Sequence, residues 1–267
     1  TDTLFPYTTL FRSRCSNNKA FWMTIRARSM TKHVFRRLPL GLLLALTIQQ
    51  GALSANLDAD DVPPPAWSPI PFARPSEFAN HMAQQHAWPR DKVEALFADY
   101  KANAQVIRLM EPAAQNFKRS WAVYRKRFIE PKRIAAGVDF WNENQKALER
   151  AGQRFGVPAH VIVGIIGVET IYGRNTGNFQ VLEALATLSF DYPRRAAYFA
   201  KELEHFLLWT QDQGIDPKSV RGSFAGAIGL PQFMPGSIRR HAVDFDGDGS
   251  IDLAGSKADA IGSVASF

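Results

Sequence analysis

A single carboxylate, Glu169, interrupts the apolar stretch Val161–Gly173, which reads V-I-V-G-I-I-G-V-E-T-I-Y-G. Burying an ionised carboxylate without a partner is costly, so such a group tends to stay protonated with a raised pKa. An acid that is protonated near neutral pH can donate a proton in catalysis. The alternative is a core helix in which Glu169 pairs with an arginine such as Arg174, because structural ion pairs also place acids in apolar surroundings.

The residues around Glu169 are expected to form a helix. Pro158 suits a first helical turn, the apolar residues continue for longer than one strand, and Gly173 can close the C-terminus. Glu169 would then lie in the last turn, beside the loop from Tyr172 to Gly177.

A second candidate segment is Arg221–Pro235, which reads R-G-S-F-A-G-A-I-G-L-P-Q-F-M-P. Its three glycines allow another group to approach the backbone closely. Ser223 and Gln232 would then be hydrogen-bonding groups on a loop, which is a common way to orient a polar substrate. The alternative is a tight connection between two helices.

A third segment, Asp244–Ser250, reads D-F-D-G-D-G-S and resembles the calcium loop of an EF-hand. Acids occupy positions one, three and five, and Gly249 occupies position six, where a sharp turn is needed. Position twelve is Gly255 instead of glutamate, so the closing ligand must come from further along the chain. A single loop of this kind favours a structural metal over a calcium sensor. The predicted calcium ligands are Asp244, Asp246, Asp248, Ser250 and Asp259.

The formal charge of +7 is confined to the start of the chain. Residues 1–54 hold eight basic residues and one acid, so the remaining chain is balanced at 24 bases and 24 acids. This balance excludes a nucleic-acid partner as the explanation of the charge.

The first 55 residues are expected to be a leader. Residues 1–29 precede Met30 and are interpreted as a non-native leader, and residues 30–55 as a secretory signal peptide, with basic residues before the apolar run Leu38–Ile48. That run is short of the roughly 20 residues of a membrane span, so no stable span is expected after cleavage; an uncleaved anchor is the alternative. The only cysteine, Cys15, lies in the leader, so the mature chain has no disulfide. Export without disulfides fits a bacterial periplasm.

The rest of the chain is predicted to be one mainly helical domain, because no strand-like alternation is found. Residues 56–75 hold six prolines and are interpreted as a linker. The aromatic stripe Phe117, Trp121, Tyr124 and Phe128 is expected to belong to the core, and a platform for a ligand is the alternative. The predicted helices run from Ser76 to before Pro89, from Asp91 through Tyr100, from Asp139 to Phe155, over the Glu169 segment, and from Pro193 to Gln213.

Together, these motifs resemble the lytic murein transglycosylase B family, glycoside hydrolase family 103. The resemblance covers roughly Phe72 to Phe267 and is carried by four segments in the family's order: Gly167–Thr170, Asp191–Arg195, Gly222–Pro235 and the EF-hand-like loop, taken as residues 244–259. It implies a mainly α, lysozyme-like catalytic core over residues 76–267, with an embedded calcium loop. Family members continue past the position of Phe267, so the domain is expected to be C-terminally truncated.

The resemblance also implies a function, an enzyme of the Gram-negative periplasm acting on peptidoglycan glycan strands. At the positions that match the family's motifs, the resemblance implies that Glu169 is the catalytic acid and then the base. It implies that Ser223 and Gln232 contact the substrate, and that Tyr124, Arg194 and Arg195 lie near the glycan. The expected reaction cleaves the β-1,4 bond between N-acetylmuramic acid (MurNAc) and N-acetylglucosamine (GlcNAc) and forms 1,6-anhydro-MurNAc.

A lone acid fits this reaction, because the sugar supplies its own nucleophile, whereas hydrolysis uses two carboxylates. Two alternatives remain open at this point: a hydrolytic muramidase on the same core, and a non-catalytic glycan-binding or calcium-stabilised scaffold protein of the envelope.

Overall fold

The computed structural model describes residues 70–112 and 120–267, which lie within the compact unit Pro64–Phe267. Helices make up most of the described residues, and the strands are two residues long. This confirms the predicted mainly helical fold. The predicted leader 1–29, the signal peptide 30–55 and most of the predicted linker 56–75 lie outside the described residues.

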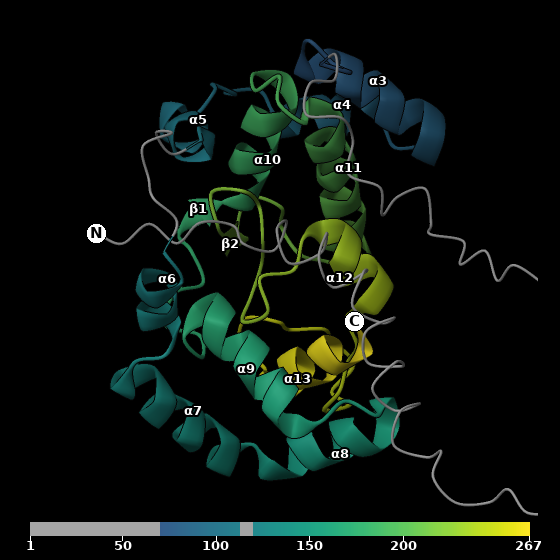
Figure 1. Cartoon of the computed structure of the whole chain (residues 1–267). Coiled ribbons are helices and arrows are strands. Elements are labelled where there is room, and N and C mark those ends of the chain that lie inside the picture. Colours follow the sequence, from purple (N-terminus) through teal and green to yellow (C-terminus); the bar gives the residue numbers. More distant parts are fainter. Residues whose placement is uncertain (1–69, 113–119) are drawn as a thin grey trace, which may run out of the picture. The chain divides into compact units, whose positions relative to one another are not determined.

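One group of helices is built around α10 and α11, which pack side by side (Figure 1). Helix α10 packs along α11, α12 packs against α11, and α5 packs against α10, while α3 and α4 pack on each other. The group consists of α3 (Pro75–His86), α4 (Arg90–Leu96), α5 (Ala104–Met110), α10 (Val181–Phe190), α11 (Ala196–Asp212) and α12 (Pro235–His241).

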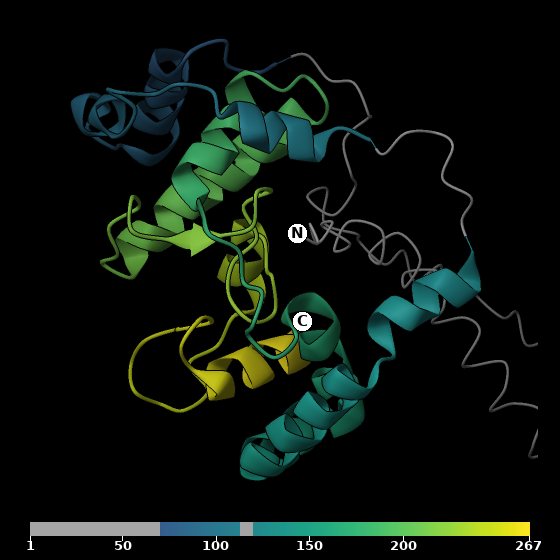
Figure 2. The same cartoon turned by 90° about the vertical axis from the view of Figure 1, so that its left-hand side faces the viewer.

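A second group contains the helix that bears Glu169. Helices α7, α8 and α9 pack on one another, and the final helix α13 packs against α8 and α9 and also reaches α12 (Figures 1 and 2). Its members are α7 (Pro131–Glu143), α8 (Gln145–Phe155), α9 (Ala159–Thr170) and α13 (Lys257–Ser266), preceded by α6 (Trp121–Phe128). The two groups share one hydrophobic core, in which Ile162 of α9 and Phe206 of α11 are both fully buried.

Two very short strands join the loops that flank the candidate site. Strand β1 (Phe179–Gln180) pairs antiparallel with β2 (Arg221–Gly222), so that Phe179 lies opposite Gly222. This pairing brings the loop after Glu169 beside the glycine-rich segment, although some 40 residues separate the two strands along the chain.

Local signals predicted several helix ends correctly. The helix predicted from Ser76 begins one residue earlier, at Pro75, and α8 ends at Phe155 as predicted, with Gly156 in the left-handed conformation with φ of 73°. Pro131, which begins α7, was not predicted as a helix start. The start predicted for the helix Asp139–Phe155 is wrong, because Asp139 lies inside α7 and the helix is interrupted at Asn144 before α8 begins.

Three further helices differ from the predictions. The predicted Asp91 helix ends at Leu96 instead of Tyr100. The helix predicted from Pro193 begins only at Ala196, after Arg195 adopts a left-handed conformation. Helix α10 was not predicted at all: nine of its ten residues are buried, so its sequence shows no polar face from which helical periodicity could be recognised.

No single helix among residues 70–112 and 120–267 is long and apolar enough to cross a membrane. Helices α8 and α9 meet the length and composition criteria only when taken together, and they are bent by 115° relative to each other.

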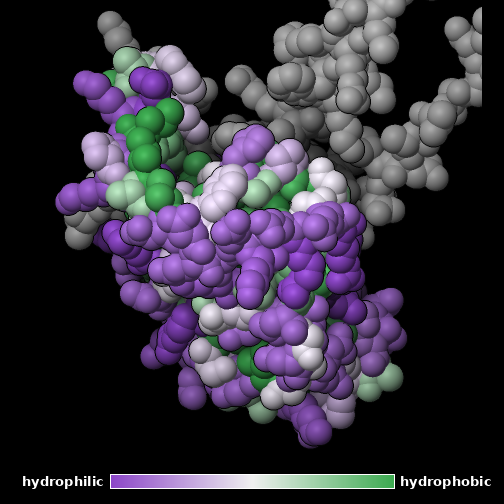
Figure 3. All heavy atoms as spheres, turned by 90° about the horizontal axis from the view of Figure 1, so that it is seen from below, coloured by the Kyte–Doolittle hydropathy of each residue, from purple (hydrophilic) through white to green (hydrophobic). Residues whose placement is uncertain are grey.

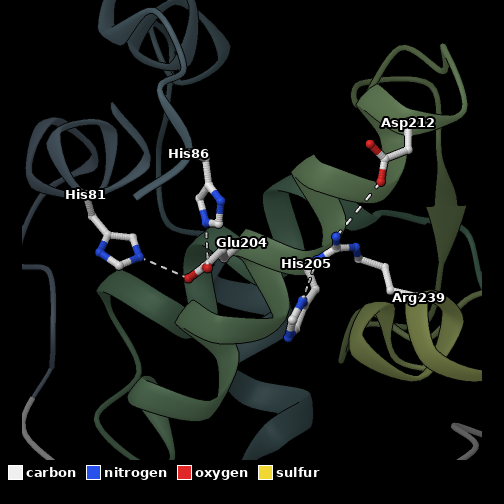
Figure 4. A network of polar contacts seen from close by, with 6 residues as sticks. All are labelled: His81, His86, Glu204, His205, Asp212 and Arg239. Atoms are coloured by element: carbon white, nitrogen blue, oxygen red, sulfur yellow. Dashed lines mark hydrogen bonds and ion pairs between the residues drawn. The ribbon is translucent and has the colours of Figure 1, made fainter. Parts of the chain in front are cut away.

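A pair of histidines attaches α3 to α11 (Figure 4). The Nε2 atoms of His81 and His86 lie 2.9 Å and 2.8 Å from the two carboxylate oxygens of Glu204. Burial acts to raise the pKa of Glu204, but the hydrogen bonds from the two histidines outweigh it and lower the pKa. The Glu204 side chain is only 22% exposed, so these bonds are weakly screened by solvent.

We expect replacement of Glu204 by glutamine to lower the free energy of unfolding by about 2 kcal/mol at neutral pH, because two charge-assisted hydrogen bonds are lost. Since the folded-state pKa is lowered, the wild-type contribution is fully present above the unfolded carboxyl value of about 4.3 and is lost as the pH falls through the folded value. Denaturant unfolding between pH 3 and pH 7 measures this.

The matched control is Glu94→Gln, which removes the exposed pair between Arg90 and Glu94 within α4. That pair should contribute only about 0.3–0.5 kcal/mol. Equal effects of the two substitutions would contradict the inferred role of Glu204.

Candidate active site

Glu169 lies in the last turn of α9, half-buried among apolar neighbours. Burial raises the pKa of its carboxyl group from 4.5 to about 7, and no charged neighbour contributes to the shift. Within the described residues the carboxylate makes no hydrogen bond or ion pair, and Arg174, the partner considered from sequence, is exposed. The side chain therefore has the properties of a proton donor that is kept protonated near neutral pH by desolvation.

The backbone turns sharply directly after Glu169. Ile171 ends α9 with φ of 52°, and Tyr172 and Gly173 follow with φ of 58° and 90°. Gly173 was predicted to end this helix, but the residue that ends it is Ile171, two residues earlier. Two consecutive non-glycine residues in the left-handed region are a strained arrangement, which persists only when surrounding contacts hold it.

Thr170 supplies part of that support. It is fully buried, and its hydroxyl donates to the carbonyl of Leu230 at 2.9 Å and accepts from the backbone N–H of Gly173 at 3.0 Å. The first bond joins the end of α9 to the glycine-rich segment, 60 residues away in sequence. The second fixes the left-handed turn directly after the acid.

The glycine-rich segment lies against the loop after Glu169 at two further points. Gln232 donates from Nε2 to the carbonyl of Thr176 at 3.0 Å and to that of Gly229 at 2.9 Å. A Cβ atom on Gly177 would lie 2.2 Å from the carbonyl oxygen of Gly222, so only glycine allows this approach. The segment is therefore a closely packed loop, and it lies beside the Glu169 end of α9.

Ser223 and Gln232, the two predicted substrate contacts, lie on this loop. Each keeps one polar group that the loop itself does not use, and the two groups differ. The Ser223 hydroxyl oxygen accepts from the N–H groups of Ala225 at 3.3 Å and Ala227 at 3.0 Å, so its own proton remains to be donated. The amide nitrogen of Gln232 is used within the fold, whereas its carbonyl oxygen makes no hydrogen bond among the described residues. The loop thus offers one donor and one acceptor.

Helix α7 supports the acid from the other side. Arg133, which is buried, donates from Nη1 to the carbonyl of Gly167 at 3.0 Å. The Tyr172 hydroxyl fits between Gly137 of α7 and Gly167 of α9, and a Cβ on either glycine would lie within 2.4 Å of it. Sequence reasoning missed both Arg133 and Tyr172. The signal for Arg133 was its place on the buried face of α7, in line with Ala136, Gly137 and Phe140 at helical spacing.

The other three predicted glycan contacts lie on neighbouring elements. Tyr124 lies on α6 and stacks between Trp121 and Phe128. Arg195 precedes α11, with its guanidinium 4.2 Å from the centre of the Tyr198 ring. Arg194 lies next to it and acts electrostatically on Tyr192. In the described part of the chain, Glu169 makes no hydrogen bond or ion pair with any of the three.

The aromatic stripe was expected to belong to the core, and for Trp121 this expectation is wrong. Trp121 is 72% exposed, and Phe117 lies outside the described residues.

The acidic loop brings three of its predicted ligands together. One carboxylate oxygen each from Asp244, Asp246 and Asp259 lies within 4.8 Å of the others, while Asp248 and Ser250 are exposed and outside this cluster. Asp259 is buried and accepts from the backbone N–H groups of Phe245 at 2.7 Å and Asp252 at 2.9 Å, which ties the two ends of the loop. Oxygen ligands of this kind fit a hard cation such as calcium.

We expect Thr170→Val to reduce stability by about 1–3 kcal/mol, because the nearly isosteric change leaves the Leu230 carbonyl and the Gly173 N–H without their partner. The turn after Glu169 should loosen, so activity should fall by more than the unfolded fraction explains. Thr210→Val is the matched control: Thr210 is also fully buried, but its hydroxyl bonds only within its own helix, to Leu207. Denaturant unfolding and turnover of both variants measure the difference, and equal losses of activity would contradict the role of Thr170.

Comparison with known proteins identifies the family of this chain. The family model described as Transglycosylase SLT domain matches residues 73–267. The chain therefore belongs to this family, and the resemblance drawn from sequence and the lysozyme-like helical core are confirmed.

Individual relatives make the comparison more specific. The curated membrane-bound lytic murein transglycosylase B of Escherichia coli (strain K12) is 47% identical over 201 residues, which are 72% of this chain and 55% of that protein. The solved structure of E. coli lytic transglycosylase Slt35 in complex with calcium is 49% identical, with a TM-score of 0.66, covering 71% of this chain and 60% of that one.

A more distant solved structure is SltB3 of Pseudomonas aeruginosa in complex with NAG-anhNAM-pentapeptide. It is 30% identical, with a TM-score of 0.64, and the match covers 72% of this chain and 50% of that one. The chain thus spans about half the length of the curated relative that it matches.

Proposed function

We propose that this chain is a peptidoglycan lytic transglycosylase that cleaves the MurNAc-β-1,4-GlcNAc bond and forms a 1,6-anhydro-MurNAc end. The observation that carries the proposal is Glu169, a single desolvated carboxyl group whose pKa is raised to about 7 and which has no charged neighbour contributing to the shift. A hydrolytic glycosidase needs a second carboxylate some 5–9.5 Å away to act as nucleophile or to activate water.

In the proposed reaction, protonated Glu169 donates its proton to the glycosidic oxygen as the bond to the muramic anomeric carbon breaks. The carboxylate that remains then removes the proton from the muramic 6-hydroxyl, whose oxygen bonds to the anomeric carbon. The proton count is restored at Glu169, and no water is consumed. Desolvation supports both steps, because it keeps the acid protonated at first and makes the resulting carboxylate a stronger base.

The loop beside Glu169 would orient the sugar. We propose that Ser223 donates its free hydroxyl proton to the muramic N-acetyl carbonyl, and that the Gln232 carbonyl oxygen accepts from a sugar hydroxyl or amide. The contacts that hold Ser223 and Gln232 in place support these roles, because both side chains are already fixed by backbone groups of the loop. Tyr124, Arg194 and Arg195 are proposed to lie along the bound glycan.

Calcium is proposed to be structural in this protein. The residues present fit a hard cation through the Asp244, Asp246 and Asp259 cluster, with Asp248 and Ser250 as further proposed ligands, and the Slt35 relative was solved in complex with calcium. Backbone hydrogen bonds, first that from Gly249, lower the pKa of Asp244 and keep it ionised for a cation. A bound ion would fix the loop that leads into α13.

The proposed location is the periplasm of a Gram-negative bacterium, with residues 30–55 as signal peptide and 76–267 as catalytic domain. The predicted leader supports export, and the name of the E. coli relative, which describes it as membrane-bound, supports a location in the cell envelope.

The decisive experiment is mass spectrometry of purified sacculi digested with this chain. We expect muropeptides that end in 1,6-anhydro-MurNAc. Products with reducing MurNAc ends would instead identify a hydrolytic muramidase, and retention of glycan without any product would identify a binding protein.

A further inference from the structure

We propose that Trp121, stacked on Tyr124, forms a platform on which a sugar ring of the glycan strand lies, so that α6 extends the Glu169 site to longer strands. This inference rests on the proposed function. It adds a binding residue, Trp121, to the site, and it assigns to α6 a preference for strand length.

The first observation is the exposure of a large aromatic face. Trp121 is 72% exposed, more than any other large hydrophobic side chain in the described part of the chain. Its ring lies 5.7 Å from that of Tyr124 at an angle of 23°, so the two rings are stacked while most of the indole surface remains exposed. An aromatic surface left in solvent is available to pack against a ligand, and a stacked neighbour holds the ring in place before a ligand binds.

The second observation is a continuous set of contacts from Trp121 to the helix of the acid. Tyr124 lies 4.8 Å from the ring of Phe128, and the guanidinium of Arg133 lies 5.3 Å from the Phe128 ring. Arg133 in turn donates to the carbonyl of Gly167, two residues before Glu169. The platform is therefore attached to the same backbone that carries the catalytic group.

The third observation is the charge around the platform. Helix α6 contains no acid, and Arg125 and Lys126 on it are exposed, as is Lys132 at the start of α7. Peptidoglycan strands carry lactyl and peptide carboxylates, which this charge would attract. A sugar ring presents C–H groups on its faces, which pack against an aromatic π face, whereas the aliphatic Ile134 and Val138, also exposed on α7, offer no such face.

Hydrophobic residues gather at the left-hand edge of the face seen from below, the side on which α6 and α7 lie in Figure 1, while the rest of that face is mainly hydrophilic (Figure 3). A protein partner would be expected to use the aliphatic and aromatic residues together. A glycan strand would use Trp121 and not the aliphatic Ile134 and Val138, and this difference makes the proposal testable.

The experiment measures binding of the full chain in an inactive Glu169→Gln background, by calorimetry. The two probes are peptide-free glycan strands of defined length and the disaccharide GlcNAc-MurNAc. Trp121→Ala should weaken binding of the strands about tenfold, because one stacking contact is lost, and leave binding of the disaccharide unchanged. Trp121→Phe should restore most of the affinity, and the matched control Ile134→Ala should change neither probe.

Each other outcome overturns the platform. If Trp121→Ala bound the strands as tightly as the Glu169→Gln protein without it, the platform would be excluded and the proposed function would stand. A loss shared with Ile134→Ala, or a change in sedimentation instead of strand binding, would indicate a protein interface. If the Glu169→Gln protein bound no strand and the wild-type chain released no anhydro product, the proposed function would be excluded, and the platform, which rests on it, would be excluded as well. Melting curves of every variant show whether a loss reflects unfolding.

Discussion

Glu169→Gln should reduce the release of anhydro-muropeptides by at least about a thousandfold, because the substitution removes both the proton donor and the base that follows it. Glutamine keeps the shape of the side chain and introduces no charge, so binding of glycan strands should persist. Product release from sacculi, followed by mass spectrometry, measures the first expectation, and strand binding by calorimetry measures the second.

Glu149→Gln provides the matched control, since Glu149 is an exposed residue of α8 whose carboxylate bonds only to Gln145 of the same helix. It should retain full activity. Wild-type rates in the Glu169 variant would exclude the proposed mechanism, whereas a loss of both binding and folded structure would show that the side chain is structural.

The same assignment predicts the pH dependence of the wild-type chain. The first step needs protonated Glu169, and burial raises the pKa of this group to about 7. As far as Glu169 determines the rate, kcat/KM should therefore be constant below pH 7 and fall about tenfold per pH unit above pH 7. A decline centred near pH 4.5, the ordinary carboxyl value, would show that Glu169 is ionised in the free protein and acts otherwise.

The second large effect is expected at the acidic loop. Asp259→Ala should lower the free energy of unfolding by on the order of 3 kcal/mol even without calcium, because it leaves the buried N–H group of Phe245 and the part-buried N–H group of Asp252 without an acceptor. It should also abolish stabilisation by calcium. In the wild-type chain that stabilisation should reach about 2.7 kcal/mol when calcium is a hundredfold above its dissociation constant, and a chelator should reverse it.

Asp248→Ala separates the two contributions, because Asp248 is exposed, lies outside the acidic cluster and accepts only from the backbone of Ser250. Its stability without calcium should change by less than about 0.5 kcal/mol. Denaturant unfolding of both variants with calcium and with chelator gives the comparison. If wild-type unfolding did not respond to calcium at all, the structural metal would be excluded, while the hydrogen-bonding role of Asp259 could still be measured.

Local sequence signals predicted those features of the fold that depend on a few consecutive residues. Gly156 fixed the end of α8 through backbone geometry alone, and the start predicted at Ser76 lies within one residue of the first residue of α3. The interior of the fold was harder to predict. Helix α10 is buried on all sides, so nothing in its sequence distinguishes an inner from an outer face. Asp139, a residue typical of helix starts, lies in mid-helix because Pro131 had already begun α7.

The amino-acid sequence by itself determined the chemistry of the candidate site: one acid in an apolar helix, a glycine-rich loop with a serine and a glutamine, and alternate acids suited to a cation. Residue type and short spacing suffice for these, because they set pKa tendencies and backbone freedom. Only the tertiary structure decided what each group faces. Thr170 meets Leu230 across 60 residues, and Trp121 lies in solvent although its spacing is typical of a core helix. Such contacts depend on how distant helices pack, and no local pattern encodes that packing.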